Sequence, residues 1–188
     1  MPDPFDILGL PPRFDLDAKT IRRAHLARVA SIHPDSHARR DESNSEHHTQ
    51  PEDDISRSAA ALNAAKRTLE DPERRANALL KRLGGASKEE DRSLPDGFLL
   101  AIMELREGVE SALASKDPAQ RHAAEADAAS RRDACIARVT DLFSSTGPVP
   151  SAETLRRIRV ELNAWRYIER LIEQLDPAYD PSVADFAE

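Results

Sequence analysis

Three adjacent residues, His33, Pro34 and Asp35, form the most specific chemical group in this sequence of 188 residues. Pro34 fixes one backbone angle, so the imidazole and the carboxylate beside it project from a tight turn between helices. A carboxylate presented in this way can accept charge-assisted hydrogen bonds from a basic group on another molecule. The triplet therefore predicts a recognition site, and the alternative is that it only turns the chain.

Other side chains with reactive or metal-binding groups are less favourably placed. His37, His47 and His48 suggest a metal site because imidazole is a common ligand, but they lie in a polar stretch without cysteine, which favours a solvated loop. Cys135 has no evident histidine partner and is expected to be a small buried thiol. We expect no catalytic residue, no bound metal and no cofactor. A histidine-loop metalloenzyme is the alternative from another functional class.

Helical segments on both sides must position the triplet. Asp17 is a suitable cap for a segment from Ala18 to Ile32, whose apolar residues recur at helical intervals. This helix is expected to end at the triplet, because a proline disfavours helical geometry in the residue before it. The sequence from Ser36 to Asp54 is polar and predicts a mobile connection. A second helical stripe follows, formed by Ile55, Ala59, Leu62, Ala65 and Leu69.

The helix before the triplet is cationic, although the whole chain has a net charge of −7. A positive helix face can steer association toward an acidic surface of a partner, and this attraction weakens as salt is added. The alternative is an ordinary solvated helix face. The basic side chains concerned are Lys19, Arg22, Arg23 and Arg28.

Composition excludes several classes of protein. Aromatic residues make up only 4% of the chain, and six glycines and 13 prolines punctuate sequence rich in alanine, leucine, arginine and glutamate, which favours an all-α fold. A single cysteine rules out an internal disulfide framework and is typical of a reducing compartment. No apolar run is long enough for a membrane span, and the acidic charge disfavours nucleic acid as a partner. We therefore expect a cytoplasmic protein.

Caps, prolines and glycines divide the rest of the chain into helices. Short helices are expected from Asp3 to Gly9 and from Glu73 to Leu83, and the charged, turn-rich stretch from Ala86 to Pro95 is the predicted domain boundary. Beyond it the spacing predicts a bundle of three longer helices joined by short loops. Their expected ranges are Asp96 to Ser115, Asp117 to Phe143, and Ser151 to Leu175.

The first of these longer helices carries more apolar residues than one buried seam can hold. Leu99, Leu100 and Met103 cannot all face inward if Phe98, Ile102 and Leu105 fill the core, so some apolar surface should remain exposed. For each of the three residues alone, core packing is the alternative. Trp165 on the last helix is expected to lie in the core.

Taken together, these segments resemble a known family. The N-terminal part resembles a J-domain, and the chain as a whole is similar to the HscB-type co-chaperones of iron–sulfur cluster assembly. The likeness covers most of the chain. It rests on Phe5-Asp6-Ile7-Leu8-Gly9-Leu10, Ile21-Arg22-Arg23-Ala24, His33-Pro34-Asp35, Leu62-Asn63-Ala64-Ala65, Leu69 to Ala76, Leu79-Leu80, Phe98-Leu99-Leu100 and Met103 to Glu107.

This resemblance implies a function for each part. A J-domain over residues 1–85 would stimulate the ATPase of a DnaK- or HscA-type chaperone through the triplet and the four basic residues named above. A bundle over residues 94–176 would bind the iron–sulfur cluster scaffold protein, and the alternative is an adaptor for a different client. The residues implied in scaffold binding are Leu99, Leu100, Met103, Glu104, Glu107 and Tyr167, of which the two glutamates can equally be surface charges.

Several positions depart from the family pattern. Ser36 and His37 follow the triplet where J-domains usually carry a lysine and an aromatic residue. His25 stands where an aromatic residue is common, and Arg28 stands where leucine is common. Ile32 and Ala65 also replace frequent aromatic residues. We expect altered packing between the helices and a smaller core.

Overall fold

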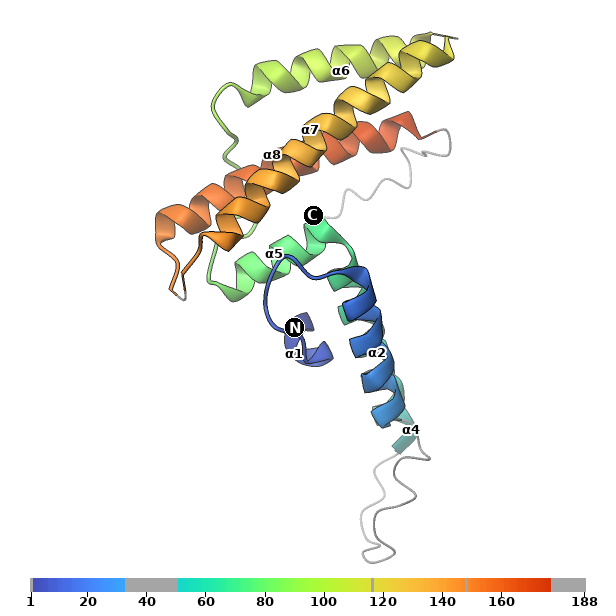
Figure 1. Ribbon diagram of the computed structural model, residues 1–188, viewed down its shortest axis with the longest axis vertical. Coiled ribbons are helices and arrows are strands. Elements are labelled where there is room, and N and C mark those ends of the chain that lie inside the picture. The colour runs from blue at the N-terminus through green and yellow to red at the C-terminus, as the bar shows by residue number, and fades with distance from the viewer. Residues whose placement is uncertain (1, 33–50, 116, 148, 177–188) are drawn as a thin grey trace, which may run out of the picture. The chain divides into compact units, whose positions relative to one another are not determined.

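The computed structural model describes residues 2–32, 51–115, 117–147 and 149–176 (Figure 1). All regular secondary structure in these ranges is helical, so the predicted all-α class is confirmed. The chain divides into two compact units, Met1–Arg82 and Leu83–Glu188. Within the described ranges, no helix is both long enough and apolar enough to cross a membrane.

The first unit begins with the short helix α1 (Pro4–Leu8), whose two ends follow the sequence signals. Asp3 accepts a hydrogen bond from the backbone N–H of Phe5 at 2.8 Å and caps the helix. Gly9 ends it in the left-handed conformation, at a φ of 65°, which glycine adopts without a steric penalty. Phe5 and Leu8 are buried, as predicted.

A helical hairpin follows, made of α2 (Ala18–Ile32) and α4 (Pro51–Glu70). The two helices pack side by side, and α1 lies against both of them (Figure 1). Asp17 caps α2 by accepting a hydrogen bond from the backbone N–H of Thr20 at 2.8 Å. Ile21 of α2 is buried. The predicted stripe of α4 supplies the buried residues Leu62, Ala65 and Leu69.

The start of α4 corrects one prediction. The polar connection was expected to reach Asp54, but the helix begins at Pro51, so the last four residues of that stretch are helical. Proline is favoured in the first turn of a helix because its missing N–H has no intrahelical partner there. Residues 51–54 contain no large apolar side chain, so hydrophobic spacing could not predict that they are helical.

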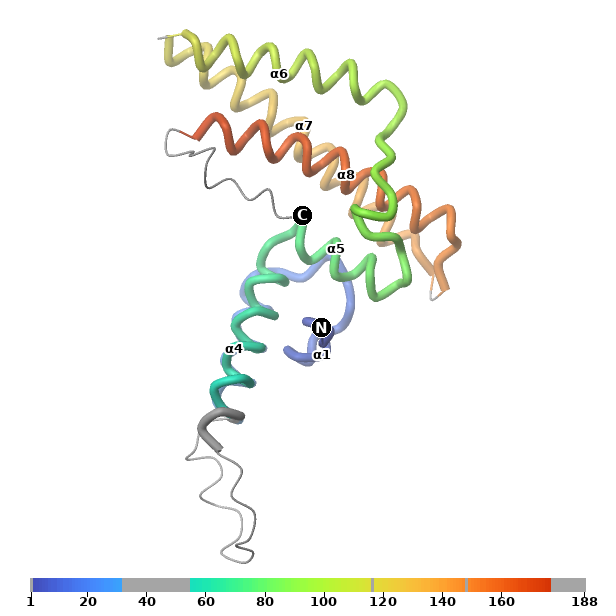
Figure 2. Tube along the Cα trace, turned by 180° about the vertical axis from the view of Figure 1, so that it is seen from behind, coloured from blue at the N-terminus to red at the C-terminus, as the bar shows by residue number. Residues whose placement is uncertain are grey.

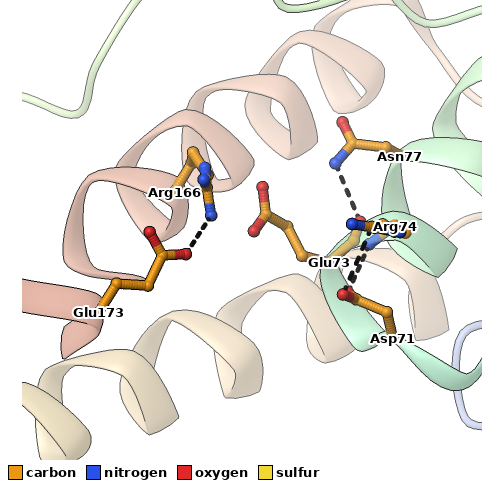
Figure 3. A network of polar contacts seen from close by, with 6 residues as sticks. All are labelled: Asp71, Glu73, Arg74, Asn77, Arg166 and Glu173. Carbon is orange, nitrogen blue, oxygen red and sulfur yellow. Dashed lines mark hydrogen bonds and ion pairs between the residues drawn. The ribbon is translucent and has the colours of Figure 1, made fainter. Parts of the chain in front are cut away.

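Helix α5 (Pro72–Arg82) completes the first unit. Asp71 caps it by accepting from the backbone N–H of Arg74 at 3.0 Å, a contact drawn in Figure 3. Arg82 in the last turn pairs with Asp3 at 2.6 Å and with Asp6 at 2.9 Å. These ion pairs join the end of α5 to the beginning of the chain.

Arg75 is a buried cation beside this junction. Its guanidinium donates to the carbonyl oxygen of Leu69 at 2.5 Å and lies over the ring of Phe14, 5.3 Å from the ring centre. Burial lowers the pKa of Arg75, whereas Asp71 and Asp15 oppose that shift. The arginine thus holds the turn between α4 and α5 against the loop before α2.

The second unit contains the predicted three-helix bundle. Its helices are α6 (Phe98–Ala114), α7 (Pro118–Ser144) and α8 (Ala152–Leu175), which pack against one another (Figure 2). Asp117 and Ser151 cap α7 and α8 through their side chains. Along α8, Arg166 pairs with Glu173 at 2.9 Å (Figure 3). The core includes Leu105, Val109, Val139, Ile158, Leu162, Ile168 and the predicted Trp165.

A buried polar contact fixes the segment before α6 to α8. The side-chain amide of Asn163 donates to the carbonyl oxygens of Asp91 and Ser93, both at 2.9 Å. Its carbonyl oxygen accepts from Nε of the buried Arg159 at 3.0 Å. One asparagine therefore forms hydrogen bonds with two backbone carbonyl groups and an arginine. These bonds hold the segment before α6 against α8.

We predict that Asn163→Ala lowers the free energy of unfolding of the second unit by about 1–3 kcal/mol, because it removes the hydrogen bonds of the amide to two part-buried carbonyl oxygens and to Arg159. Denaturant unfolding followed by circular dichroism would measure the loss. Gln120→Ala removes the same amide group from an exposed site on α7 and is expected to change stability by less than about 0.5 kcal/mol. Equal stability of the two variants would contradict the role assigned to Asn163.

Candidate functional site

Three basic residues of α2 form an exposed surface, here called the cationic face: Lys19, Arg22 and Arg23. The helix contains no acidic residue. Nε of Arg22 lies 3.7 Å from a carboxylate oxygen of Glu70 on α4, a loose and solvated ion pair. Among the described residues, neither Lys19 nor Arg23 lies within ion-pair distance of an acidic side chain. The cationic face therefore presents positive charge to solvent.

Arg28 differs from the other three predicted basic residues. Its guanidinium lies against Gly9, so that a Cβ atom at position 9 would collide with Nη2 of Arg28. The side chain thus reaches from α2 to the end of α1, although it is exposed. The guanidinium of this arginine therefore lies over the turn after α1, in the position where the family pattern favours leucine. Its role in chaperone binding stays a prediction.

His33, Pro34 and Asp35 lie outside the described residues. Helix α2 is described as far as Ile32, the residue before the triplet, and the predicted stop at the proline stays a prediction. His25, which replaces a common aromatic residue, contacts Asn63 of α4 across the hairpin, with 3.0 Å between Nε2 and Oδ1. The altered packing predicted at this position is a polar contact between α2 and α4.

The second unit exposes an apolar surface at the start of α6. The exposed fractions are 64% for Leu99, 67% for Leu100 and 59% for Met103. These three residues lie on the side of the helix opposite to the buried Leu105 and Val109. The expectation that some apolar surface remains exposed is confirmed, and core packing is excluded for all three residues.

Tyr167 of α8 lies beside this surface. Its ring meets Phe98 edge to face, with 6.1 Å between the ring centres and 63° between their planes. Tyr167 itself is 46% exposed, and Phe98 directly precedes Leu99 in α6. The contact with Phe98 places Tyr167 next to the residue that precedes Leu99. We call four of the predicted residues the apolar patch: Leu99, Leu100, Met103 and Tyr167.

The two predicted glutamates border the apolar patch. Glu104 and Glu107 are exposed and follow Leu100 and Met103 by one turn of α6. Arg106, which lies between them in sequence, pairs with Glu110 at 2.7 Å. In the described part of the chain neither glutamate has an ion-pair partner, so both carboxylates are available as a polar rim.

Two features next to the apolar patch could not be predicted from the sequence. Gly97 precedes α6 in the left-handed conformation, at a φ of 74°, which glycine adopts without a steric penalty. Arg131 of α7 donates to the carbonyl oxygen of Ala101 at 3.1 Å and pairs with Asp127 at 3.2 Å. An arginine on an amphipathic helix is usually read as a solvated charge, so spacing alone could not identify this link between α7 and α6.

Cys135 occupies the buried position predicted for it. Burial raises the pKa of its thiol, and the nearby Arg138, whose guanidinium is 3.1 Å from the sulfur, only partly offsets this effect. A thiol of this kind is a poor nucleophile. His37, His47 and His48, the proposed metal ligands of the alternative hypothesis, lie outside the described residues.

The fold and these surfaces define a class, an all-α protein in which a J-type helical hairpin is joined to a three-helix bundle with an exposed apolar patch. Comparison with known proteins adds a family. Residues 94–176 match the family model described as the HSCB C-terminal oligomerisation domain. A co-chaperone protein HscB homolog of Burkholderia mallei is 31% identical over 172 residues, which cover 89% of this chain and 94% of that protein. The chain therefore belongs to the HscB family of co-chaperones.

Other relatives agree with this assignment. The HscB homolog of Vibrio cholerae is 30% identical over 173 residues, 91% of this chain and 97% of that protein. The solved structure of the chaperone HscB from Vibrio cholerae has a TM-score of 0.69 at 26% identity and covers 93% of this chain and 95% of its own. The human co-chaperone HscB, at 19% identity and a TM-score of 0.73, shares the fold over 93% of this chain and 81% of its own. The resemblance found in the sequence is confirmed.

Proposed function

We propose that this chain links two proteins during iron–sulfur protein maturation. It stimulates the ATPase of a DnaK- or HscA-type chaperone and delivers the iron–sulfur cluster scaffold protein to it. The observation that carries the proposal is that each unit exposes a surface of its own type, the cationic face in the first and the apolar patch in the second. Membership in a co-chaperone family supports it.

The J-domain, for which we propose the limits 1–85, acts on the chaperone. The cationic face draws in an acidic partner surface, and its helix leads directly to His33, Pro34 and Asp35. Asp35 accepts charge-assisted hydrogen bonds from a basic group of the chaperone at the interface. Arg28 adds positive charge near the end of the same helix while it contacts the turn after α1.

The bundle, residues 94–176, binds the scaffold protein. Leu99, Leu100, Met103 and Tyr167 supply apolar area at the centre of the contact, and Glu104 and Glu107 supply the polar rim. Because one chain carries both binding surfaces, the scaffold reaches the chaperone at a high effective concentration.

On this proposal the chain itself catalyses no reaction. Nucleotide hydrolysis belongs to the chaperone, and the iron–sulfur cluster is carried by the scaffold protein. Neither a resident metal nor a cofactor is needed for the two binding events. The activity is placed in the cytoplasm, with no role for nucleic acid or a membrane.

A steady-state ATPase assay with the purified full chain, a DnaK- or HscA-type chaperone and the scaffold protein tests the proposal. The chain is expected to raise the hydrolysis rate alone, and further when the scaffold is present. Chaperone alone and chaperone with scaffold are the controls. No stimulation in any mixture would contradict the proposal. Stimulation without scaffold binding would support instead an adaptor that recruits a different client.

A further inference from the structure

An exposed leucine lies among the positive charges of α2. Leu26 is 66% exposed, whereas the residue before it, His25, contacts α4. The other large apolar side chain that is exposed in the described part of this unit is Val29, one turn further along α2. The two residues therefore form a small apolar surface on the outer side of the hairpin.

The helical spacing places Leu26 within the cationic face. It follows Arg23 by three residues, Arg22 by four and Lys19 by seven, and all of these separations bring side chains onto one side of a helix. The three basic residues are exposed, as Leu26 is. The leucine is thus bordered by long cationic side chains whose apolar stems can cover it once a partner approaches.

Charge and apolar contact have different effects at such a surface. Exposed cations increase the rate of encounter with an acidic partner but add little net affinity, because water and salt screen them. The contribution of an apolar side chain that becomes fully buried on docking is not screened by salt. Such a side chain also slows dissociation. A buried apolar residue surrounded by polar contacts that exclude water is the usual arrangement at the centre of an interface.

We propose that Leu26 is an apolar anchor for chaperone docking, which enters an apolar recess in an otherwise acidic surface of the DnaK-type chaperone. The acidic character follows from charge complementarity, since α2 contains only basic charges in a chain of net charge −7. This inference rests on the proposed function and adds a residue that the charge pattern alone does not identify.

Titration calorimetry of the full chain into the ATP-bound chaperone, at several salt concentrations, tests the anchor. Leu26→Ala is expected to raise the dissociation constant about tenfold and to leave its salt dependence unchanged. Arg23→Ala is expected to reduce the salt dependence, because it removes a screened charge. Leu26→Lys adds a cation and is nevertheless expected to weaken binding, whereas purely electrostatic docking would strengthen it.

Leu113→Ala, which truncates an exposed leucine on α6, is the matched control and is expected to leave chaperone affinity unchanged. Thermal unfolding should be the same for the Leu26 variants and the unaltered chain, because the side chain is exposed. A change of less than about twofold in the dissociation constant of Leu26→Ala would overturn the role of Leu26 alone. Tighter binding by Leu26→Lys would do the same. An unaltered chain that does not dock at all would overturn the proposed function together with the anchor.

Discussion

Asp35→Asn is expected to abolish stimulation of the chaperone ATPase while the fold stays intact. The amide has nearly the size and shape of the carboxylate, but the negative charge and its charge-assisted hydrogen bonds are lost. Removing one partner of a desolvated charge pair at an interface costs about 2–5 kcal/mol, which exceeds a tenfold loss of affinity. The hydrolysis rate should fall to that of the chaperone alone in a steady-state assay.

Asp41→Asn is the matched control for this effect. It removes the same charge from the polar stretch that follows the triplet, without altering the triplet itself. This variant is expected to stimulate the chaperone ATPase nearly as strongly as the unaltered chain does. Circular dichroism and scaffold binding should be normal in both variants. Undiminished stimulation by Asp35→Asn would count decisively against the role of the triplet.

The sequence predicted those parts of the fold that depend on local chemistry. Asp3 and Gly9 bound α1, Asp17 starts α2, and Asp117 with Pro118 starts α7. Each of these signals acts through a backbone group within a few residues, so the sequence contains all the information needed. The apolar spacing of α4 identified the buried Leu62, Ala65 and Leu69 for the same reason.

Contacts between distant residues could not be predicted in this way. Arg75 carries a charge and is nevertheless buried over Phe14, and Asn163 is buried because two carbonyl groups from a distant segment need its amide. Arg28 lies against Gly9, a contact that depends on how α1 packs on the hairpin. A polar residue in a helical pattern is normally assigned to solvent, and only tertiary packing reverses that assignment.

The candidate surfaces show the same division. Spacing indicated that α6 has more apolar residues than its core can hold, and the exposed Leu99, Leu100 and Met103 agree. Spacing alone did not place Tyr167 beside them, because that depends on how α8 packs against α6; the family resemblance supplied it, and the contact with Phe98 agrees. Spacing did not identify Leu26, since its exposure depends on which side of α2 faces α4.

The double substitution Leu99→Ala with Met103→Ala is expected to weaken binding of the scaffold protein by at least about 1–3 kcal/mol, the scale of interface residues with large effects. Both side chains are exposed, so their truncation removes contact area from the apolar patch and leaves the buried residues of the bundle untouched. Calorimetry with the purified scaffold protein would measure the change.

Leu113→Ala again supplies the control, because it shortens an exposed leucine on the same helix about three and a half turns beyond Leu100 and should not alter scaffold affinity. In the absence of scaffold, the double variant is expected to stimulate the chaperone ATPase as well as the unaltered chain does, since the cationic face and the triplet belong to the other unit. Its additional stimulation by scaffold should be lost. If the double variant binds the scaffold as tightly as the unaltered chain does, the apolar patch is not the client site. If it also loses stimulation of the chaperone ATPase in the absence of scaffold, the two binding functions are not separated between the units.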